Sequence, residues 1–320
     1  MTHYLVTGAA GFIGSHFVRD LLGPAGPPDV EVTVLDALTY AGDPANLARV
    51  LGDPRLRFVQ GDITDAALVE KLPTPGSVVV NFAAESHVDR SIAAAGTFVH
   101  TNVLGTQTLL DAALAAGARC FLQVSTDEVY GSIDAGSWTE EAPVRPNSPY
   151  AATKAAADLL ALSYARTHGL DVRITRCGNN YGPGQYPEKL IPRFVTLLLA
   201  GRPVPLYGDG GNVRDWLHVS DHCRAVRLVL DRGTPGEVYN VGGGTQLTNR
   251  ELTGLLLDAC GAGWDAVRPV EDRKGHDRRY CVDDSKLRRL GHRPRVPFEQ
   301  GLAETVDWYR RLIEHPARRK

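Results

Sequence analysis

The sequence predicts an α/β protein with a doubly wound parallel sheet, because short apolar runs alternate with helical stretches through its first half. A second observation is a glycine-rich turn directly after the first apolar run, which is where open sheets of this kind bind dinucleotides. The length of 320 residues, with 43% hydrophobic and 22% charged residues, gives an ordinary globular composition. We therefore expect one large or two modest domains with a sizeable core.

The first strand and its turn read Tyr4-Leu-Val-Thr-Gly8-Ala-Ala-Gly11-Phe-Ile-Gly14, and a helix is expected to begin near Phe12. Glycine lets such a turn be tight and lets the backbone approach a pyrophosphate, which then meets the amides of the helix N-terminus. The spacing is Gly-x-x-Gly-x-x-Gly, and any tight turn between a strand and a helix can use glycine. The motif alone is therefore weak evidence for a dinucleotide.

Three further strands are predicted at residues 31–35, 57–60 and 78–84. The first of these ends at Asp36, roughly 20 residues beyond the glycines, where an acid accepts a hydrogen bond from an adenosine ribose hydroxyl. That carboxylate favours NAD over NADP. The next apolar run, Cys120-Phe-Leu-Gln-Val124, predicts a buried parallel strand.

The segment Ser125-Thr-Asp-Glu128 follows that strand, and ligands of open α/β sheets lie at the carboxyl ends of strands. Asp127 and Glu128 could cap a helix or be solvated loop charges. They could also be a general acid and a general base, which need different environments to acquire different pKa values. Neighbouring side chains at a strand end point in different directions, which is one way to provide such environments.

A Tyr-x-x-x-Lys pair follows in Ser148-Pro-Tyr150-Ala-Ala-Thr-Lys154, where serine and proline predict the start of a helix. Side chains four residues apart lie on one helical face. An ammonium near a phenol favours the phenolate and lowers the tyrosine pKa toward a value useful for taking a proton from a hydroxyl. The alternative is an ordinary tyrosine and lysine at helical spacing.

Composition argues against several partners. The formal net charge of −2 gives no basic field for nucleic acid or a membrane surface. Five cysteines without metal-ligand spacing predict free thiols in a reducing compartment and no metal site. The N-terminus enters a strand without a signal-peptide pattern, and no apolar run approaches the roughly 18 residues of a membrane span. We expect a cytoplasmic protein.

After about residue 180, loops rich in proline and glycine replace the regular alternation, which predicts a separate lobe. These loops carry Lys189, Arg214, Arg273 and His276, which are potential phosphate ligands. Residues 298–313 have apolar side chains at helical spacing and predict a docking helix. Cys177 is interpreted as a small packing residue because nothing indicates a low thiol pKa.

The motifs together resemble the extended short-chain dehydrogenase/reductase superfamily, and Thr126-Asp127-Glu128 resembles the dTDP-glucose 4,6-dehydratases within it. Matching blocks run through nearly the whole chain: Ala83-Ala-Glu-Ser-His-Val-Asp89, Asn179-Asn180-Tyr-Gly-Pro, Pro187-Glu-Lys-Leu-Ile-Pro192, Gly208-Asp-Gly-Gly-Asn-Val-Arg214-Asp-Trp-Leu-His and Val270-Glu-Asp-Arg-Lys-Gly-His276-Asp-Arg-Arg-Tyr280. Two departures, Gly178 in place of a frequent serine and a short loop at 132–146, put only local substrate contacts in doubt. The short loop resembles members from antibiotic sugar pathways.

The resemblance implies a Rossmann-type NAD-binding domain over residues 1–180 that includes the catalytic residues. It implies a smaller nucleotide-sugar-binding lobe over 181–320, with some later segments returning to the first domain. The NAD-binding positions it implies are Gly8, Gly11, Phe12, Ile13, Gly14, Asp36, Leu38, Thr39, Asp62, Ile63, Ala83, Ala84, Ser86, Thr101, Tyr150, Lys154 and Asn180. The positions it implies for the dTDP-sugar are Ser86, Thr126, Asn179, Lys189, Leu190, Pro205, Tyr207, Arg214, Asn249, Arg273, His276 and Tyr280.

The resemblance also implies an NAD-dependent hydro-lyase that converts dTDP-glucose to dTDP-4-keto-6-deoxyglucose and water, in deoxysugar or antibiotic sugar biosynthesis. Tyr150 and Lys154 would serve oxidation at C4, with Thr126 donating to the C4 oxygen. Glu128 would remove the C5 proton and Asp127 would protonate the leaving C6 hydroxyl. Helices at about 97–116 and 150–167 would form a four-helix homodimer interface, although their apolar faces could instead pack on their own sheet.

Two rival functions stay open from the sequence. A nucleotide-sugar 4-epimerase or decarboxylase on the same scaffold needs the tyrosine and lysine but not the Asp-Glu pair. A non-catalytic NAD-sensing protein would keep the glycine turn and lose the chemistry, and the intact Tyr150 and Lys154 argue against it.

Overall fold

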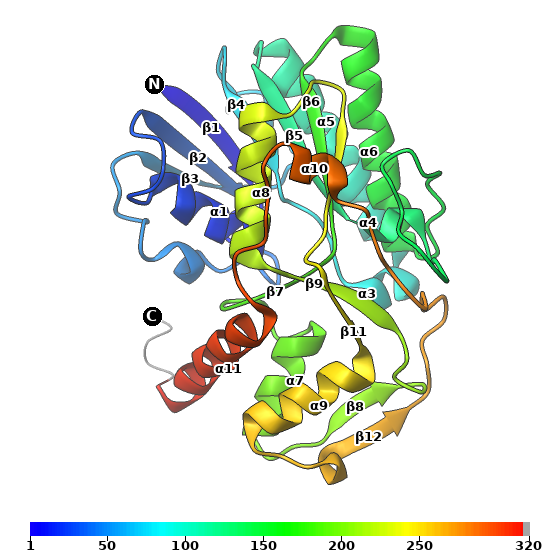
Figure 1. Cartoon of the computed structure of the whole chain (residues 1–320). Helices are drawn as coiled ribbons and strands as arrows, with labels where there is room; N and C mark the ends of the chain where they lie inside the picture. Colours follow the sequence, from blue (N-terminus) through cyan, green and yellow to red (C-terminus); the bar gives the residue numbers. More distant parts are fainter. Residues whose placement is uncertain (316–320) are drawn as a thin grey trace.

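The computed structural model describes residues 1–315 and contains a seven-stranded sheet in the order β10-β6-β5-β4-β1-β2-β3. Every neighbouring pair in this sheet is parallel, which confirms the predicted doubly wound fold. Figure 1 shows the sheet and its helices in one part of the molecule and a smaller lobe beyond one end of the strands. The strands are β1 (Thr2–Thr7), β2 (Val30–Asp36), β3 (Leu56–Gln60), β4 (Val78–Asn81), β5 (Cys120–Thr126), β6 (Val172–Cys177) and β10 (Val238–Val241).

Helices cover both faces of the large sheet because its strands are apolar on both sides. On one face lie α1 (Phe12–Leu22) and α8 (Val219–Arg232), and on the other lie α5 (Gly105–Ala115) and α6 (Pro149–His168). Alternate residues of each strand therefore enter different cores. In β1, for example, Val6 belongs to the first core and its neighbour Leu5 to the second.

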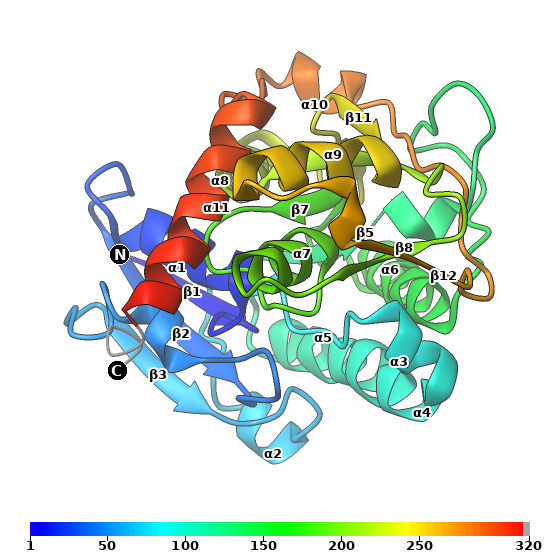
Figure 2. The same cartoon turned by 90° about the horizontal axis from the view of Figure 1, so that it is seen from below.

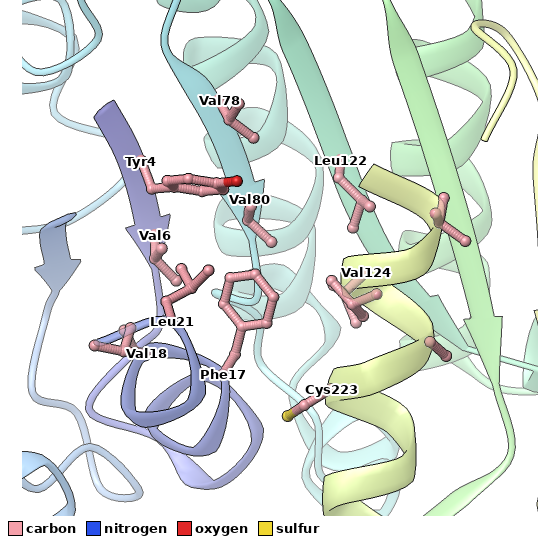
Figure 3. Packing of buried hydrophobic residues seen from close by; sticks show 14 of the residues in the cluster. Tyr4, Val6, Phe17, Val18, Leu21, Val78, Val80, Leu122, Val124 and Cys223 are labelled. Carbon is pink, nitrogen blue, oxygen red and sulfur yellow. The ribbon is translucent and has the colours of Figure 1, made fainter. Parts of the chain in front are cut away.

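Figure 3 shows the first core, where Phe17 and Leu21 of α1 point toward the strands at the centre of the sheet. Phe17 is fully buried, as is Val80 of β4 against which this face of α1 packs. Cys223 enters the same core from α8. This packing fixes the first turn of α1 above the carboxyl end of β1, where the glycine turn lies.

The smaller lobe is built from two short sheets and three principal helices. Its three-stranded sheet has the order β11-β9-β7, and β12 pairs with β8 in a two-stranded sheet. Figure 2 shows α7, α9 and α11 gathered around these strands. The elements are β7 (Asn179–Tyr181), β8 (Val204–Tyr207), β9 (Val213–His218), β11 (Thr245–Thr248), β12 (Val267–Val270), α7 (Leu190–Leu199), α9 (Asn249–Cys260) and α11 (Phe298–Glu314).

The chain crosses between the two parts several times, so the lobe is not one continuous stretch. Strand β10 pairs with β6 in the large sheet, and α8 packs on that sheet as well. The short helix α10 (Ser285–Arg289) also lies against β10 through Leu287. Strand β10 and helices α8 and α10, which follow residue 180, therefore belong to the core of the large sheet, and the domain boundary near residue 180 stays a prediction.

Two strand ends differ by two or more residues from those expected. Strand β5 continues to Thr126, so Ser125 and Thr126 belong to the strand and only Asp127 and Glu128 follow it. Strand β4 stops at Asn81 rather than Ala84. The glycine turn after β1 packs directly against the backbone just beyond β4, since a Cβ on Gly8 would lie 2.6 Å from the Ala83 nitrogen.

The remaining helices connect the sheet to the lobe. Helix α2 (Ala66–Val69) follows β3, and α3 (Val88–Ala93) follows the segment after β4. Helix α4 (Ala95–Phe98) continues through a π-helical stretch, Val99–Leu104, into α5. Across residues 1–315, no helix is long and apolar enough to cross a membrane, and no cluster of ligand side chains could hold a metal ion.

Candidate active site

The glycine turn after β1 leaves the start of α1 open toward a cavity. The N-cap residue of α1 is Gly11, so no capping side chain accepts from the first amides of the helix. The first turn also carries no acidic residue. A Cβ on Gly14 would lie 2.6 Å from the Gly8 oxygen, so glycine is needed there for the helix to approach the turn. The free amides at this helix end fit a pyrophosphate, which is the group that NAD would place there.

Asp36, at the end of β2, ties the glycine turn to its neighbouring strand. Its carboxylate accepts hydrogen bonds of 2.8 Å from the Ala10 and Leu38 amides. Burial raises the pKa of Asp36, and these backbone amides oppose that rise. The side chain still lines the cavity, which fits its predicted contact with a ribose hydroxyl.

Strand β5 is buried along its whole length and ends at the cavity. Its last residues and the turn that follows therefore place Thr126, Asp127 and Glu128 in the cavity lining. A single 3₁₀ turn, Asp127–Tyr130, follows it and ends at Gly131 with φ of 77°. A Cβ on Gly131 would lie 2.4 Å from the Arg145 oxygen, so this turn requires glycine. The turn buries Asp127 and leaves Glu128 partly exposed.

The two carboxylates therefore have different surroundings. Burial, followed by the charges of Glu128 and Asp215, raises the pKa of Asp127 well above its ordinary value. Burial also raises the pKa of Glu128, but Arg273, Arg214 and Lys189 oppose that rise. Asp127 is thus favoured as the protonated acid and Glu128 as the group closer to ionisation.

Helix α6 presents Tyr150 and Lys154 to the same cavity. Ser148 caps this helix by accepting a hydrogen bond from the Ala151 amide at 3.1 Å, and Pro149 occupies its first position. Both Tyr150 and Lys154 are buried. The ring of Phe98 stands edge-on to Tyr150 at 6.4 Å between centroids and helps to fix its orientation.

The expected effect of Lys154 on the Tyr150 pKa is not seen in this arrangement. Burial and then the Glu128 charge raise the pKa of Tyr150 well above its ordinary value, and only the Thr126 hydroxyl opposes them. The Lys154 ammonium instead donates to the Val124 carbonyl at 2.7 Å. The sequence argument omitted the cost of burying a phenolate, which exceeds the benefit of one ammonium on the same helical face.

The smaller lobe contributes cations across the cavity. Lys189 donates to the Ser86 carbonyl at 2.6 Å, and Arg273 lies 3.7 Å from a carboxylate oxygen of Asp89. The Arg214 guanidinium lies over the Tyr280 ring at 4.3 Å. His276 pairs with the Asp272 carboxylate at 2.5 Å. These groups could bind a diphosphate, since positive charge is concentrated on this side of the cavity.

Tyr280 was expected to contact substrate, and the structure shows a second role for its hydroxyl. It donates to Asp277 at 2.6 Å and approaches a Glu128 carboxylate oxygen at 3.3 Å. Asn147 in turn donates to the other oxygen of Asp277 at 2.5 Å. The predicted substrate contact of Tyr280 stays a prediction, because the ring also lines the cavity.

One continuous cavity of about 450 Å³ joins the glycine turn to the smaller lobe. Its lining contains all of the predicted catalytic and substrate positions and every predicted NAD position except Leu38. Leu38 has φ of 52° and uses its amide to hold Asp36, so its contribution is through the backbone. The individual binding roles remain predictions, although the structure brings these residues together.

Several lining residues were not predicted. Examples are Glu85, Tyr186, Glu188 and Arg193. Arg90 lies over the Tyr40 ring at 3.8 Å and pairs with Glu188 at 3.3 Å. No local pattern marks such a cluster, because it joins Glu85 and Arg90 to residues about 100 positions further along the chain, near the start of α7.

Gly178 has a structural explanation in this chain. A Cβ at this position would lie 2.8 Å from the Asp215 oxygen, so a serine would require β9 to move. Its neighbour Cys177 is buried, and burial raises the pKa of the thiol to about 12. This agrees with a packing role for Cys177 rather than a nucleophilic one.

Comparison with known proteins agrees with this geometry. The model of the GDP-mannose 4,6 dehydratase family matches residues 5–305. A dTDP-glucose 4,6-dehydratase from Streptomyces griseus is 64% identical over 309 residues, covering 96% of this chain and 94% of the relative. The crystal structure of DesIV, a dTDP-glucose 4,6-dehydratase from Streptomyces venezuelae with NAD and dTDP bound, is 64% identical with a TM-score of 0.95 over 97% of both chains.

A more distant structure is also similar. The UDP-glucose 4-epimerase of Thermus thermophilus in complex with NAD is 35% identical, with a TM-score of 0.88 over 97% of this chain and 99% of that one. The sheet, the glycine turn and the Tyr-Lys pair thus define a Rossmann-type protein of the extended short-chain dehydrogenase/reductase class. The chain belongs to the GDP-mannose 4,6 dehydratase family, and dTDP-glucose 4,6-dehydratases match it along almost their entire length.

Proposed function

We propose that this chain is an NAD-dependent hydro-lyase that converts dTDP-glucose to dTDP-4-keto-6-deoxyglucose and water. Its relatives at 64% identity carry that activity in their names, and DesIV was solved with NAD and dTDP. The observation that carries the proposal is the pair Asp127 and Glu128, which both line the cavity beside Tyr150, with Asp127 buried and Glu128 partly exposed. Elimination of water needs an acid and a base at one place, and this pair provides both.

The first half-reaction is oxidation at C4. Tyr150 takes the proton of the C4 hydroxyl, and Thr126 lies close enough to influence the phenol through a hydrogen bond. The glycine turn and Asp36 would hold NAD, which would supply the hydride acceptor for C4 and the hydride donor for C6. Lys154 places positive charge beside this centre, where it favours the phenolate once substrate completes the site.

The second half-reaction is elimination across C5 and C6. A carbonyl at C4 acidifies the C5 hydrogen, which Glu128 then removes as the general base. Asp127 protonates the C6 hydroxyl as it leaves, because the raised pKa of Asp127 keeps a proton available. When the hydride returns to C6, C5 takes a proton back from Glu128. The proton that Tyr150 took from the C4 hydroxyl then replaces, through solvent, the one that Asp127 gave to the leaving water, so the turnover is balanced.

The main rival is a 4-epimerase, which has the same fold at 35% identity. An epimerase needs oxidation and reduction at C4 but no acid at C6. The buried and protonated state favoured for Asp127 has no use in that reaction. The NAD-sensing alternative leaves the cavity-lining Tyr150, Lys154 and Asp127 without a function.

The smaller lobe would hold the dTDP group of the substrate. Arg214, Arg273, Lys189 and His276 surround the cavity on that side and fit a diphosphate. The division into an NAD-binding domain and a substrate lobe follows this arrangement. The five free cysteines agree with a reducing compartment, so we retain the cytoplasm as the expected location.

The purified protein is expected to carry bound NAD and to turn over without added cofactor, because each turnover regenerates the oxidised form. Denaturing the protein and identifying the released nucleotide by mass spectrometry tests the first part. Conversion of dTDP-glucose to a 4-keto product in cofactor-free buffer tests the second. Recovery of NADP would contradict the assignment, as would an empty protein that added NAD does not activate.

We also propose a homodimer built from the outer faces of the π-helical segment, α5 and α6. The sequence left open whether the apolar faces of these helices pack on their own sheet or against a second copy. One face does pack on the sheet, through Leu109 and Leu110. The opposite face leaves Val99, Leu104 and Leu159 between 43% and 58% exposed. Val99 and Leu104 line a groove together with Leu160, and the exposed apolar side chains suit packing against the same helices of a second copy.

Leu159→Glu is expected to convert the dimer to a monomer, because it places two charges opposite each other across a two-fold interface. Leu255→Glu on α9, where the side chain is 37% exposed, is the matched control and should leave the dimer intact. Light scattering at micromolar concentration distinguishes the two masses. A monomeric wild-type protein, or equal behaviour of the two variants, would reject this interface.

A further inference from the structure

Helix α6 carries a buried carboxylate that the reaction described above does not use. Asp158 lies one helical turn beyond Lys154 and two turns beyond Tyr150, so all three face the same side of α6. Asp158 is 0% exposed and does not line the cavity. An aspartate in such a place is rare unless its charge is compensated.

The carboxylate of Asp158 is held from several segments. Arg176 of β6 donates to it through Nε at 2.9 Å, and both side chains are almost fully buried. The same guanidinium lies over the Tyr130 ring at 4.8 Å. Tyr130 donates its hydroxyl to the Asn240 side chain at 2.8 Å, which connects the group to β10. The position of Asp158 is therefore fixed by the sheet and not only by its own helix.

Lys154 needs such a neighbour. Its ammonium has three protons to donate, and the Val124 carbonyl at 2.7 Å accepts one of them. Burial lowers the pKa of Lys154, and the group that most opposes this is Asp158, followed by Cys177. The Cys177 thiol stays protonated because burial raises its pKa to about 12. Burial also raises the pKa of Asp158, and Arg176 is the group that most opposes this rise, so the Arg176 guanidinium keeps a negative charge available beside the ammonium.

We propose that Asp158 is a positioning residue that supplies the buried counter-charge for the Lys154 ammonium and keeps it protonated beside Tyr150. The inference rests on the proposed function, in which Lys154 supports oxidation at C4. Asp158 touches neither the cavity nor the reacting atoms, and it acts through Lys154 alone. Arg176 supports this effect, because its guanidinium pairs with the Asp158 carboxylate and opposes the rise in pKa that burial causes.

The pH dependence follows from the groups around this centre. The groups that act on Asp158 are Lys154 of α6, Arg176 of β6 and Ser125 of β5. Glu140 acts on the neighbouring Tyr130. Asp158→Asn removes the negative charge and lets the Lys154 pKa fall further. The alkaline limb of the oxidation rate should then move to lower pH by roughly one unit, as expected for loss of one nearby opposite charge.

Single-turnover formation of NADH at C4 oxidation measures this limb directly. At a pH above the shifted alkaline limb, we expect Asp158→Asn to oxidise C4 about tenfold more slowly than wild type. The KM for dTDP-glucose should be unchanged, because the carboxylate does not line the cavity. Asp221→Asn is the matched control: Asp221 is 1% exposed, pairs with Arg224 and stabilises α8 far from Lys154. Asp221→Asn should lower the stability of the protein without moving the alkaline limb of the oxidation rate.

Arg176→Gln provides a second variant that acts from the other partner of the carboxylate. It removes the cation that most opposes the burial-raised pKa of Asp158, so Asp158 becomes neutral, the Lys154 pKa should fall and the alkaline limb should move to lower pH, as in Asp158→Asn. This variant keeps the proposal testable if Asp158→Asn does not fold. An NMR titration of the Lys154 side chain, assigned with Lys154→Arg, gives the same pKa without any substrate.

These experiments distinguish a failure of the proposed dehydratase activity from a failure of the role proposed for Asp158. If wild-type protein forms no 4-keto product, the proposed function fails, and the NMR titration alone then decides the inference. If wild-type protein is active but the limb and the Lys154 pKa are the same in Asp158→Asn and Arg176→Gln as in wild type, Asp158 has only a structural role and the proposal is overturned.

Discussion

Asp127→Asn is expected to oxidise dTDP-glucose at C4 at a normal rate but to lose the elimination of water. Oxidation is unaffected because it belongs to Tyr150, whereas asparagine cannot protonate the leaving C6 hydroxyl. A general acid contributes typically about 10²- to 10⁴-fold, or roughly 3 to 5 kcal/mol of barrier, so the loss should be large. Single-turnover absorbance should show NADH that persists, with the 4-keto-6-deoxy product formed slowly.

The leaving group provides the matched test of this role. Fluoride departs with less protonation than hydroxide, so Asp127→Asn should retain more activity toward 6-deoxy-6-fluoro dTDP-glucose. Glu128→Gln should lose activity on both sugars, because its defect lies in removing the C5 proton. Equal losses of Asp127→Asn on the two leaving groups would defeat the assignment of Asp127 as the acid.

The stability of Asp127→Asn should depend on pH less than that of wild type, which can be measured separately from its loss of elimination. Burial raises the pKa of Asp127, so the folded state binds this proton more tightly than the unfolded state. The stabilising contribution of that proton is complete below the unfolded pKa and is lost as pH rises toward the folded pKa. Asparagine carries no such proton, and the thermal unfolding midpoint of the variant should fall less than that of wild type as pH is raised.

Tyr150→Phe is expected to lose oxidation itself, so that neither NADH nor product forms. Phenylalanine fills the same buried position, which keeps the edge-on contact with Phe98, but it cannot accept the C4 hydroxyl proton. The loss should reach at least about 10²-fold, the lower range for a general base. Binding of dTDP-glucose, measured by calorimetry, should change little.

Tyr164→Phe is the control for Tyr150→Phe. Tyr164 lies on the same helix, but its hydroxyl contacts Asp111 away from the cavity. It should leave oxidation at the wild-type rate. Normal NADH formation by Tyr150→Phe would show that another group takes the C4 proton.

Local sequence patterns predicted much of this molecule because they report local physics. The glycines Gly8 and Gly14 are required by close backbone contacts, and Ser148 with Pro149 begins α6 as expected. The alternation of apolar runs and helices predicted the parallel sheet, which is confirmed. The C-terminal apolar spacing likewise predicted a helix, and α11 follows it from Phe298.

Features that depend on distant parts of the chain could not be predicted in this way. The raised pKa of Asp127 depends on Asp215, which reaches the site from β9 of the other lobe. The approach of Tyr280 to Glu128 joins residues 152 positions apart. Spacing also could not give the depth of burial of Tyr150, which decides its pKa in the free protein.

The most direct test of the proposed function follows one deuterium atom through the reaction. The protein is incubated in ordinary water with dTDP-glucose labelled with deuterium at C4, and the product is examined by NMR. We expect dTDP-4-keto-6-deoxyglucose with the deuterium on the C6 methyl group, because the hydride removed from C4 returns to C6. A nucleotide sugar that keeps its C6 hydroxyl and carries the deuterium at an inverted C4 would contradict dehydration and indicate an epimerase, and recovery of unchanged substrate from the NAD-loaded protein would contradict the proposed activity.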